Sequence, residues 1–222
     1  MVKNLPIIAI DGTAASGKGT LARRLANRLG YACLDTGLLY RRVALSLLHN
    51  GQALDDVDAA MAVAQSIHAN DLGHPDLRGA DAGRGASIVA AMPGVRKALI
   101  DFQRDFAKNP PALMNNTPAR GAILDGRDIG TAICPEAQAK FFVDADVTVR
   151  ATRRHNELLS KGETLSYDRV LDDMKIRDAR DAGRADAPMV AAPDAVLLDT
   201  TAMGPDAVFE KALSIIAEKI AS

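Results

Sequence analysis

The sequence predicts an α/β fold, with a five-stranded parallel sheet flanked by helices. Short apolar runs alternate with stretches of helical spacing, and strands joined by helical crossovers pair in parallel. An aspartate follows directly after every run, and ligands of such sheets bind beyond the carboxyl ends of the strands. The runs are residues 5–10, 31–34, 122–124, 140–143 and 195–198, so we expect a site where Asp11, Asp35, Asp125, Asp144 and Asp199 gather.

The composition indicates one compact domain with inserted lobes. The chain has 222 residues, of which 48% are hydrophobic and 25% charged, as in ordinary globular proteins. A net charge of −1 gives no field for non-specific nucleic-acid binding, so any phosphate site is local. Cys33 and Cys134 make no disulfide framework, and the N-terminal apolar run is shorter than a membrane span of ~20 residues. We therefore expect a cytoplasmic protein with reduced thiols and without nucleic-acid or membrane partners.

The segment between the first strand and the first helix predicts a phosphate-binding loop. Residues 12–20 read Gly-Thr-Ala-Ala-Ser-Gly-Lys-Gly-Thr, and helical spacing begins at Gly19. Glycines let backbone N–H groups turn inward around phosphate, and the following helix adds its positive end. Lys18 would supply a charge for the β- and γ-phosphates of ATP, and the Thr20 hydroxyl would help to hold Mg²⁺. The predicted ATP contacts are Gly12, Thr13, Ala14, Ala15, Ser16, Gly17, Lys18, Gly19 and Thr20.

This loop differs from the general P-loop pattern, in which Ser or Thr follows the lysine directly. Here Gly19 stands between Lys18 and Thr20, and this Gly-Lys-Gly-Thr form resembles that of nucleoside-monophosphate kinases. A glycine-rich turn without a ligand is the alternative. The strand before the loop and the helix after it favour a P-loop kinase.

The remaining elements follow in order along the chain. We expect helices over 38–70 with a break at Gly51, a flexible Gly- and Asp-rich segment over 71–86, and a helix over 95–108. Three prolines make 109–120 a loop, and 126–137 is loop and turn. Two charged helices cover 147–186, interrupted near 160–166, and a helix beginning with Pro205 ends at 221.

Arginines dominate the basic residues of the charged helical pair. Arg177, Arg180 and Arg184 are spaced by three and four residues, which places them on one face of one helix. Arginine suits bidentate phosphate contact, so this face is expected to meet anions. The alternative is a solvated face on which Asp178 and Asp181 pair with the arginines. The phosphate-binding loop in the same chain favours the first interpretation.

Four segments together resemble bacterial cytidylate kinases, in the family's order and over nearly the whole chain. Residues 35–41 look like the family's DSGxxYR segment, and 124–131 are similar to its DGRDxGT segment. Residues 176–184 resemble its RDxRDxxR lid helix, and 87–96 its SxVAxxPxVR stretch. The resemblance implies a P-loop kinase with a core of 1–41, 95–146 and 187–222, an acceptor-binding lobe at 42–94 and a lid at 147–186. It also implies a monomer that transfers the γ-phosphate of ATP, carried with Mg²⁺, to CMP or dCMP.

The acceptor site follows from the chemistry of the transfer and from the resemblance. Phosphoryl transfer needs alignment and positive charge, so Arg41, Arg127 and Arg184 are candidates for the acceptor phosphate, and Lys18, Arg127 and Arg184 for catalysis. Cytosine presents an amine donor beside two acceptors. The resemblance implies that Asp128 accepts from the amine, which disfavours uracil, while Arg96 and Ser87 donate, and that Asp181 and Arg177 hold the ribose. The CMP contacts are Thr36, Tyr40, Arg41, Ser87, Arg96, Arg127, Asp128, Arg177, Asp181 and Arg184.

The first lid helix carries three further arginines. Arg150 and Arg154 lie one helical turn apart, and we expect them to reach the ATP phosphates when the lid closes and excludes water. Of the two, Arg154 is assigned to ATP. Arg153 points elsewhere and is expected in a surface ion pair.

Three departures from the family pattern lead to further expectations. The loop carries Ala15 where the family usually has another glycine, and we expect function to survive if φ at Ala15 is negative. The short segment 72–86 stands in place of a β-rich insert, so the acceptor lobe is expected to be mobile. Residues 112–121 extend a loop, and nothing in the sequence explains that extension.

Two other functions stay open at this point. One is a P-loop kinase for another small molecule, which the predicted base contacts Ser87, Arg96 and Asp128 would distinguish. The other is a non-catalytic nucleotide-binding switch. The sequence has no Asn-Lys-x-Asp motif, and a switch does not need a second pocket of arginines.

Overall fold

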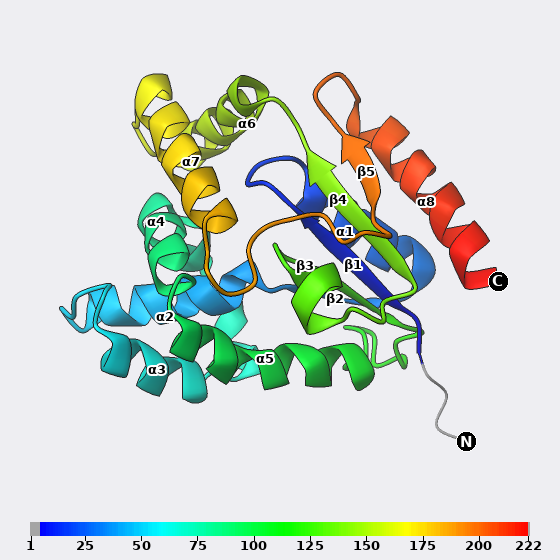
Figure 1. Ribbon diagram of the computed structural model, residues 1–222, viewed down its shortest axis with the longest axis horizontal. Coiled ribbons are helices and arrows are strands. Elements are labelled where there is room, and N and C mark those ends of the chain that lie inside the picture. Colours follow the sequence, from blue (N-terminus) through cyan, green and yellow to red (C-terminus); the bar gives the residue numbers. More distant parts are fainter. Residues whose placement is uncertain (1–4, 222) are drawn as a thin grey trace.

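The computed structural model describes residues 5–221, so the ends of the predicted core at residues 1–4 and 222 lie outside it. Five strands form one parallel sheet in the order β2-β3-β1-β4-β5 (Figure 1). Each predicted apolar run forms one strand, which confirms the α/β class. The strands are β1 (Ile7–Gly12), β2 (Ala32–Asp35), β3 (Ala122–Asp125), β4 (Ala139–Asp144) and β5 (Val196–Asp199).

Helices cover both faces of the sheet. Ile8 and Ile10 of β1 pack in a cluster with α1 and α8, whereas Ile7 and Ala9 face α5 and a short π-helix, η3. Side chains alternate along a strand, so a strand buried on both faces is apolar throughout. The longer helices are α1 (Lys18–Leu29), α2 (Gly37–His49), α3 (Val57–Gln65), α4 (Ala80–Val89), α5 (Pro93–Lys108), α6 (Val147–Ser160), α7 (Tyr167–Ala182) and α8 (Pro205–Ala221), and η3 is Ile129–Ile133.

Part of the predicted flexible segment 71–86 is helical, and that prediction is wrong. Two 3₁₀ turns, Ala69–Gly73 and Pro75–Arg78, lead into α4, which packs against α2. The glycines serve close packing rather than mobility, because a Cβ on Gly85 would lie 2.7 Å from the Ala44 Cβ. The helices α2, α3, α4 and α5 share one apolar cluster, which includes Leu39, Ala60, Ala86 and Leu99.

The charged segment forms the predicted helical pair, α6 and α7, which stands above the acceptor lobe in Figure 1. Asp146 caps α6 by accepting from Thr148 N at 2.8 Å, and Ser166 caps α7 by accepting from Arg169 N at 3.3 Å. The second helix ends at Ala182, so Arg184 does not lie on its face as predicted. Residues 126–137 were predicted as loop and turn, and they include η3. Within residues 5–221, every helix is too short or too polar to cross a membrane.

Candidate active site

A cavity of about 780 Å³ opens at the carboxyl ends of β1, β2 and β3, between the acceptor lobe and the lid. Predicted site residues from six separate segments line it together, because the ends of parallel strands meet at one edge of the sheet. The predicted residues that line it are Ala14, Ala15, Gly17, Lys18, Gly19, Thr20, Thr36, Tyr40, Arg41, Ser87, Arg96, Arg127, Asp128, Arg154, Arg177, Asp181 and Arg184. Gly12, Thr13 and Ser16 lie behind this surface, where they shape the loop.

Packing and hydrogen bonds fix the phosphate-binding loop. Gly12 has φ 138°, and a Cβ there would lie 1.9 Å from the Val143 carbonyl oxygen, so only glycine fits. Thr13 Oγ1 donates to Asp144 Oδ1 at 2.6 Å, and Ser16 Oγ donates to the Thr13 carbonyl oxygen at 3.0 Å. Gly17 has φ 94°, and a Cβ added there would meet nothing within 4 Å, which leaves its backbone open to the cavity.

The condition of a negative φ at Ala15 is not met, since the structure gives φ 58°. The loop must bend through the left-handed region between its two outer glycines, and an L-residue with a side chain is strained there by about 1–2 kcal/mol. Hydrogen bonds from Thr13 and Ser16 nevertheless hold the loop in place.

We expect Ala15→Gly to raise the free energy of unfolding by about 0.5–1 kcal/mol, because glycine removes the strain at positive φ. Chemical denaturation measures the change. Ala14→Gly is the matched control, since Ala14 has no positive φ and its replacement should lower stability. A lower stability in Ala15→Gly would contradict the strain at this residue.

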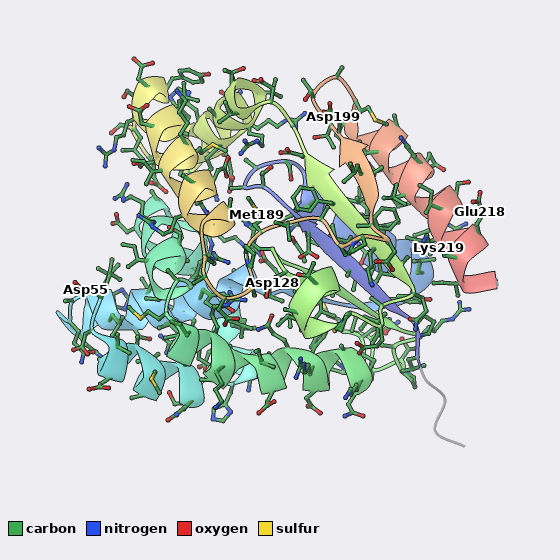
Figure 2. All side chains as sticks on the ribbon, in the orientation of Figure 1. Asp55, Asp128, Met189, Asp199, Glu218 and Lys219 are labelled. Carbon is green, nitrogen blue, oxygen red and sulfur yellow. The ribbon has the colours of Figure 1, made fainter. Side chains whose placement is uncertain are left out.

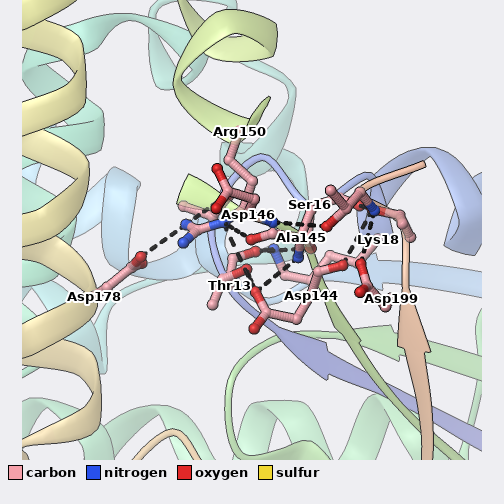
Figure 3. A network of polar contacts seen from close by, with 12 residues as sticks. Thr13, Ser16, Lys18, Asp144, Ala145, Asp146, Arg150, Asp178 and Asp199 are labelled. Carbon is pink, nitrogen blue, oxygen red and sulfur yellow. Dashed lines mark hydrogen bonds and ion pairs between the residues drawn. The ribbon is translucent and has the colours of Figure 1, made fainter. Parts of the chain in front are cut away.

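Figure 3 shows how the lid helices connect to the loop. Arg150 is buried, and its Nε donates to the Ala145 carbonyl oxygen at 2.7 Å while Nη1 pairs with Asp178 at 2.7 Å. Arg150 Nη1 also lies 3.4 Å from the Ala14 carbonyl oxygen. The predicted reach of Arg150 to the ATP phosphates is therefore not seen, because its donors already hold the base of the lid to the loop.

The predicted surface ion pair of Arg153 is also wrong. Its guanidinium donates to the Oγ1 and carbonyl oxygen of Thr200, at 3.1 and 2.7 Å. Thr200 Oγ1 in turn donates to the Ser16 carbonyl oxygen at 2.8 Å, so this arginine also braces the loop. Arg154, which is predicted to bind ATP, lines the cavity and pairs with Glu157 at 2.9 Å.

Lys18 is buried between the loop and the end of β3. Its Nζ donates to the Thr13 carbonyl oxygen at 3.2 Å and lies 3.7 Å from Asp125 Oδ1. Burial, with the charge of Arg127, lowers the pKa of Lys18, and burial raises the pKa of Asp125. Neither charge is well solvated. A triphosphate that binds Lys18 would therefore give it a stronger ionic partner than Asp125.

The same carboxylate explains the glycine that follows Lys18. A Cβ on Gly19 would lie 3.0 Å from Asp125 Oδ2, so a side chain there would crowd the aspartate. Asp125 Oδ1 is buried and makes no hydrogen bond, and the Thr20 hydroxyl is exposed in the cavity. Protein oxygens of this number and type fit Mg²⁺, which keeps water and substrate phosphates as its other ligands. No group of three or more His, Cys, Asp or Glu side chains in the described chain could hold a metal ion by itself.

Three arginines converge on one buried carboxylate. Asp181 is 1% exposed, and it accepts from Arg127 Nε at 3.0 Å and from Arg184 Nη2, with Arg177 Nε at 3.7 Å. Burial by itself raises the pKa of Asp181, but the arginines outweigh it and lower that pKa. Burial and the charge of Arg127 lower the pKa of Arg177 to about 9. Three positive charges against one negative leave an excess that favours an anion.

The predicted alternative of Asp178 and Asp181 pairing with the arginines is partly realised, but the pairs are not on a solvated face. Asp178 pairs with Arg150 at the base of the lid. Asp181 lies inside the cavity, and the Nε atoms of Arg177 and Arg184 are buried there without a hydrogen-bond partner. Unsatisfied buried donors beside a cavity indicate a polar ligand.

The predicted base contacts also lie together. Asp128, near the centre of the molecule in Figure 2, forms a buried ion pair with Arg96. Burial raises the pKa of Asp128, and the charge of Arg96 opposes that shift. Ser87 Oγ donates to the Arg84 carbonyl oxygen at 3.3 Å and accepts from Arg180 Nη1. The sequence indicates Arg180 only as part of a helix face. The structure adds its hydrogen bond to Ser87, one of the predicted base contacts.

Two predicted CMP contacts, Thr36 and Arg41, already donate hydrogen bonds to backbone carbonyl oxygens of the protein. Thr36 Oγ1 donates to the Asp125 carbonyl oxygen at 2.9 Å. Arg41 donates to the carbonyl oxygens of Leu77 and Gly79, at 2.8 and 3.3 Å, and burial lowers its pKa to about 10. These bonds fix the acceptor-lobe side of the cavity. Tyr40 is buried beside them at its wall.

The lid and the acceptor lobe touch across the cavity mouth. Glu163 Oε1 accepts from the Ala80 backbone N–H at 3.3 Å, and Lys161 Nζ donates to the Arg78 carbonyl oxygen at 3.3 Å. Arg84 lies 3.7 Å from Asp173. Glu163 thus satisfies a backbone donor at the start of α4, whose own Gly79 offers no side-chain cap.

The chain is similar to known proteins in sequence and in fold. The cytidylate kinase family model matches residues 8–218. The cytidylate kinase of Rhodospirillum rubrum is 54% identical over 213 residues, covering 96% of this chain and 98% of the relative, and that of Paramagnetospirillum magneticum is 54% identical over 215 residues, with the same coverage. A crystal structure of an uncharacterized protein from Eubacterium ventriosum shares the fold, with a TM-score of 0.53 at 14% identity over 96% of this chain and 99% of that one. The chain belongs to the cytidylate kinase family.

Proposed function

We propose that the cavity is the active site of a phosphotransferase that moves the γ-phosphate of ATP to CMP or dCMP, giving ADP and CDP or dCDP. The arginine cluster around Asp181 is the observation that carries this proposal. A nucleoside monophosphate brings close to two negative charges, which matches the excess of two positive charges there. Family membership supports the reaction independently.

The residues divide into two groups by their place in the cavity. The loop of residues 12–20 binds the triphosphate through the part that lines the cavity, with Lys18 at the β- and γ-phosphates and Arg154 of the lid beside them. Arg127 and Arg184 face the transferring group, and they stabilise its charge as it passes to the acceptor. Thr20 and Asp125 would hold Mg²⁺, which would neutralise charge on the phosphates.

The acceptor is oriented by its base and its phosphate. Asp128 accepts from the cytosine amine, while Arg96 and Ser87 donate to the ring acceptors. Arg41 and Arg177 complete the phosphate and ribose side. Contacts between the lid and the acceptor lobe exclude water from the transferring phosphate, which prevents hydrolysis of ATP. We also propose a cytoplasmic monomer, supported by the family resemblance and by the two free cysteines.

The experiment that tests the reaction is ADP release from Mg-ATP, with CMP, dCMP, UMP, AMP and GMP as separate acceptors. Turnover with CMP and dCMP well above the other acceptors supports the proposal. Turnover with a different acceptor would keep the phosphotransferase and overturn the assignment of the base contacts. Absence of acceptor-dependent turnover would favour the nucleotide-binding switch.

We expect Asp128→Ala to lower kcat/KM for CMP by about 10–100-fold and to reduce the preference for CMP over UMP. The variant removes the acceptor for the cytosine amine, and it leaves Arg96 buried with only the distant Asp186, 3.9 Å away. The KM for ATP should change little, because Asp128 lies on the acceptor side. Steady-state kinetics with both acceptors measure the change.

Asp186→Ala is the matched control, since this carboxylate faces the same arginine but is 62% exposed. Its preference for CMP should match that of the wild type. An unchanged CMP preference in Asp128→Ala would remove Asp128 from the base site.

A further inference from the structure

Asp11 is a buried carboxylate that the proposed reaction does not use. It lies at the carboxyl end of β1, is 4% exposed, and has no ion-pair partner among residues 5–221. Burial raises its pKa to about 7, although backbone hydrogen bonds oppose that shift. A buried carboxylate without a cation is costly, so its surroundings should show what it stabilises.

Both carboxylate oxygens of Asp11 bind the first turn of η3. Oδ1 accepts from the Ile129 backbone N–H at 2.7 Å, and Oδ2 accepts from the Gly130 backbone N–H at 2.8 Å. These are the N–H groups that a helix leaves without an internal partner. The carboxylate of Asp11 therefore caps η3 from a strand 118 residues earlier in the chain.

The residue at the N-cap position of η3 is Asp128, yet its side chain makes no capping hydrogen bond. Aspartate is among the best N-cap residues and would ordinarily accept from the N–H groups that follow it. Here the carboxylate of Asp128 is turned to Arg96 instead. Asp11 therefore accepts hydrogen bonds from the backbone N–H groups of η3, whereas Asp128 pairs with Arg96 among the base contacts.

The rest of η3 is fitted to this arrangement. A Cβ on Gly130 would lie 3.4 Å from Asp11 Oδ2 and 3.2 Å from the Lys140 Cδ, so glycine allows the close approach. At the other end, Arg104 donates to the carbonyl oxygens of Ile133 and Ala132, at 3.2 and 3.0 Å. Ile129 is fully buried. The turn that carries Asp128 is therefore fixed at both ends.

We propose that Asp11 is a positioning residue for acceptor recognition: by binding the backbone N–H groups of Ile129 and Gly130, it leaves the Asp128 carboxylate free to face the acceptor base. The proposal rests on the proposed function of the cavity. It predicts that loss of Asp11 changes acceptor affinity and base preference. Without Asp11, the Asp128 carboxylate would accept hydrogen bonds from the backbone N–H groups of η3 and turn away from the acceptor base.

The test uses Asp11→Asn, whose amide group turns a donor toward one of the two backbone N–H groups. The expected result is a rise in the KM for CMP of about tenfold and a reduced preference for CMP over UMP, with the KM for ATP within about twofold of wild type. A residue with only a structural role would lower the fraction of folded enzyme, and hence the apparent kcat, without changing either acceptor readout. Asp199→Asn is the control, because Asp199 also ends a strand and accepts one backbone N–H, from Thr201 at 2.8 Å, outside the cavity.

A second variant keeps the proposal testable if Asp11→Asn fails to fold. Arg104 is exposed, so Arg104→Met should fold, and it loosens the far end of the same turn. The same change in base preference, smaller in size, is expected there. A wild-type CMP preference and KM in a folded Asp11→Asn, or in Arg104→Met when Asp11→Asn does not fold, would overturn the proposal. A wild-type enzyme that does not phosphorylate CMP would instead overturn the proposed function itself.

Discussion

Replacement of Asp181 by alanine is expected to lower kcat/KM for CMP by about 10²–10⁴-fold, which corresponds to the 3–5 kcal/mol lost when one partner of a buried ion pair is removed. Asp181 is the shared partner of Arg127, Arg177 and Arg184. Without it the three guanidinium groups repel one another and leave the positions in which they meet the acceptor phosphate. Steady-state kinetics and thermal unfolding measure the two consequences.

The stability of this variant should respond to anions. Inorganic phosphate should raise the Tm of Asp181→Ala more than that of the wild type. A bound phosphate would supply the negative charge that the three arginines lose with Asp181. The difference in unfolding free energy between the wild type and Asp181→Ala should become smaller at acid pH. The lowered pKa of Asp181 means that its contribution is present above the ordinary aspartate pKa and is lost as pH falls through its folded pKa.

Asp172→Ala is the matched control for this effect, since Asp172 is exposed on the same helix. Its kinetics and its response to phosphate should match the wild type. If Asp181→Ala retained kcat/KM within about threefold of the wild type, the convergent cluster would not be the acceptor phosphate site.

Lys18→Met is expected to lower kcat by about 10²–10³-fold, the effect of removing one preorganised donor from the transferring charge. Its stability should change little. The pKa of Asp125 is already raised by burial, so this carboxyl group can take up a proton when its cationic neighbour is removed. Loss of catalysis with an unchanged Tm would separate the catalytic role of Lys18 from a structural one.

Arg28→Met is the control for loss of a cation, because Arg28 is exposed in the last turn of the same helix, far from the loop. It should retain wild-type kinetics. A kcat for Lys18→Met within tenfold of wild type would show that the triphosphate does not depend on this lysine.

Local signals in the sequence were sufficient for most of the fold. The strands β1 and β3 are continuous apolar runs because each is buried on both faces, whereas Leu197 of the edge strand β5 is 66% exposed. Turn residues around the runs mark their ends. The site was predictable in position because parallel strands end at one edge, which brings Lys18, Asp125 and Asp128 together. Its residues were predictable in kind because phosphate requires arginine, lysine and glycine in recognisable spacing.

Glycine-rich segments show where such signals are ambiguous. Glycine permits unusual backbone angles, but it also permits close packing, and the sequence does not say which use applies. The sequence predicts a flexible segment over 71–86, yet Gly83 and Gly85 of that segment pack closely within α4. Ala15 shows the converse, since a residue with a side chain lies at positive φ, where glycine is usual.

The sequence by itself therefore determined the sheet, the phosphate-binding loop and the chemical types that line the cavity, because these depend on burial patterns and short motifs. Only the tertiary structure decided which partner each charged side chain takes. Arg150 binds the Ala14 carbonyl oxygen, Arg153 binds Thr200, Asp181 pairs with Arg127, and Asp11 caps a distant turn. Such pairs join residues far apart in the chain, and their energies depend on distance and burial, which no local pattern contains.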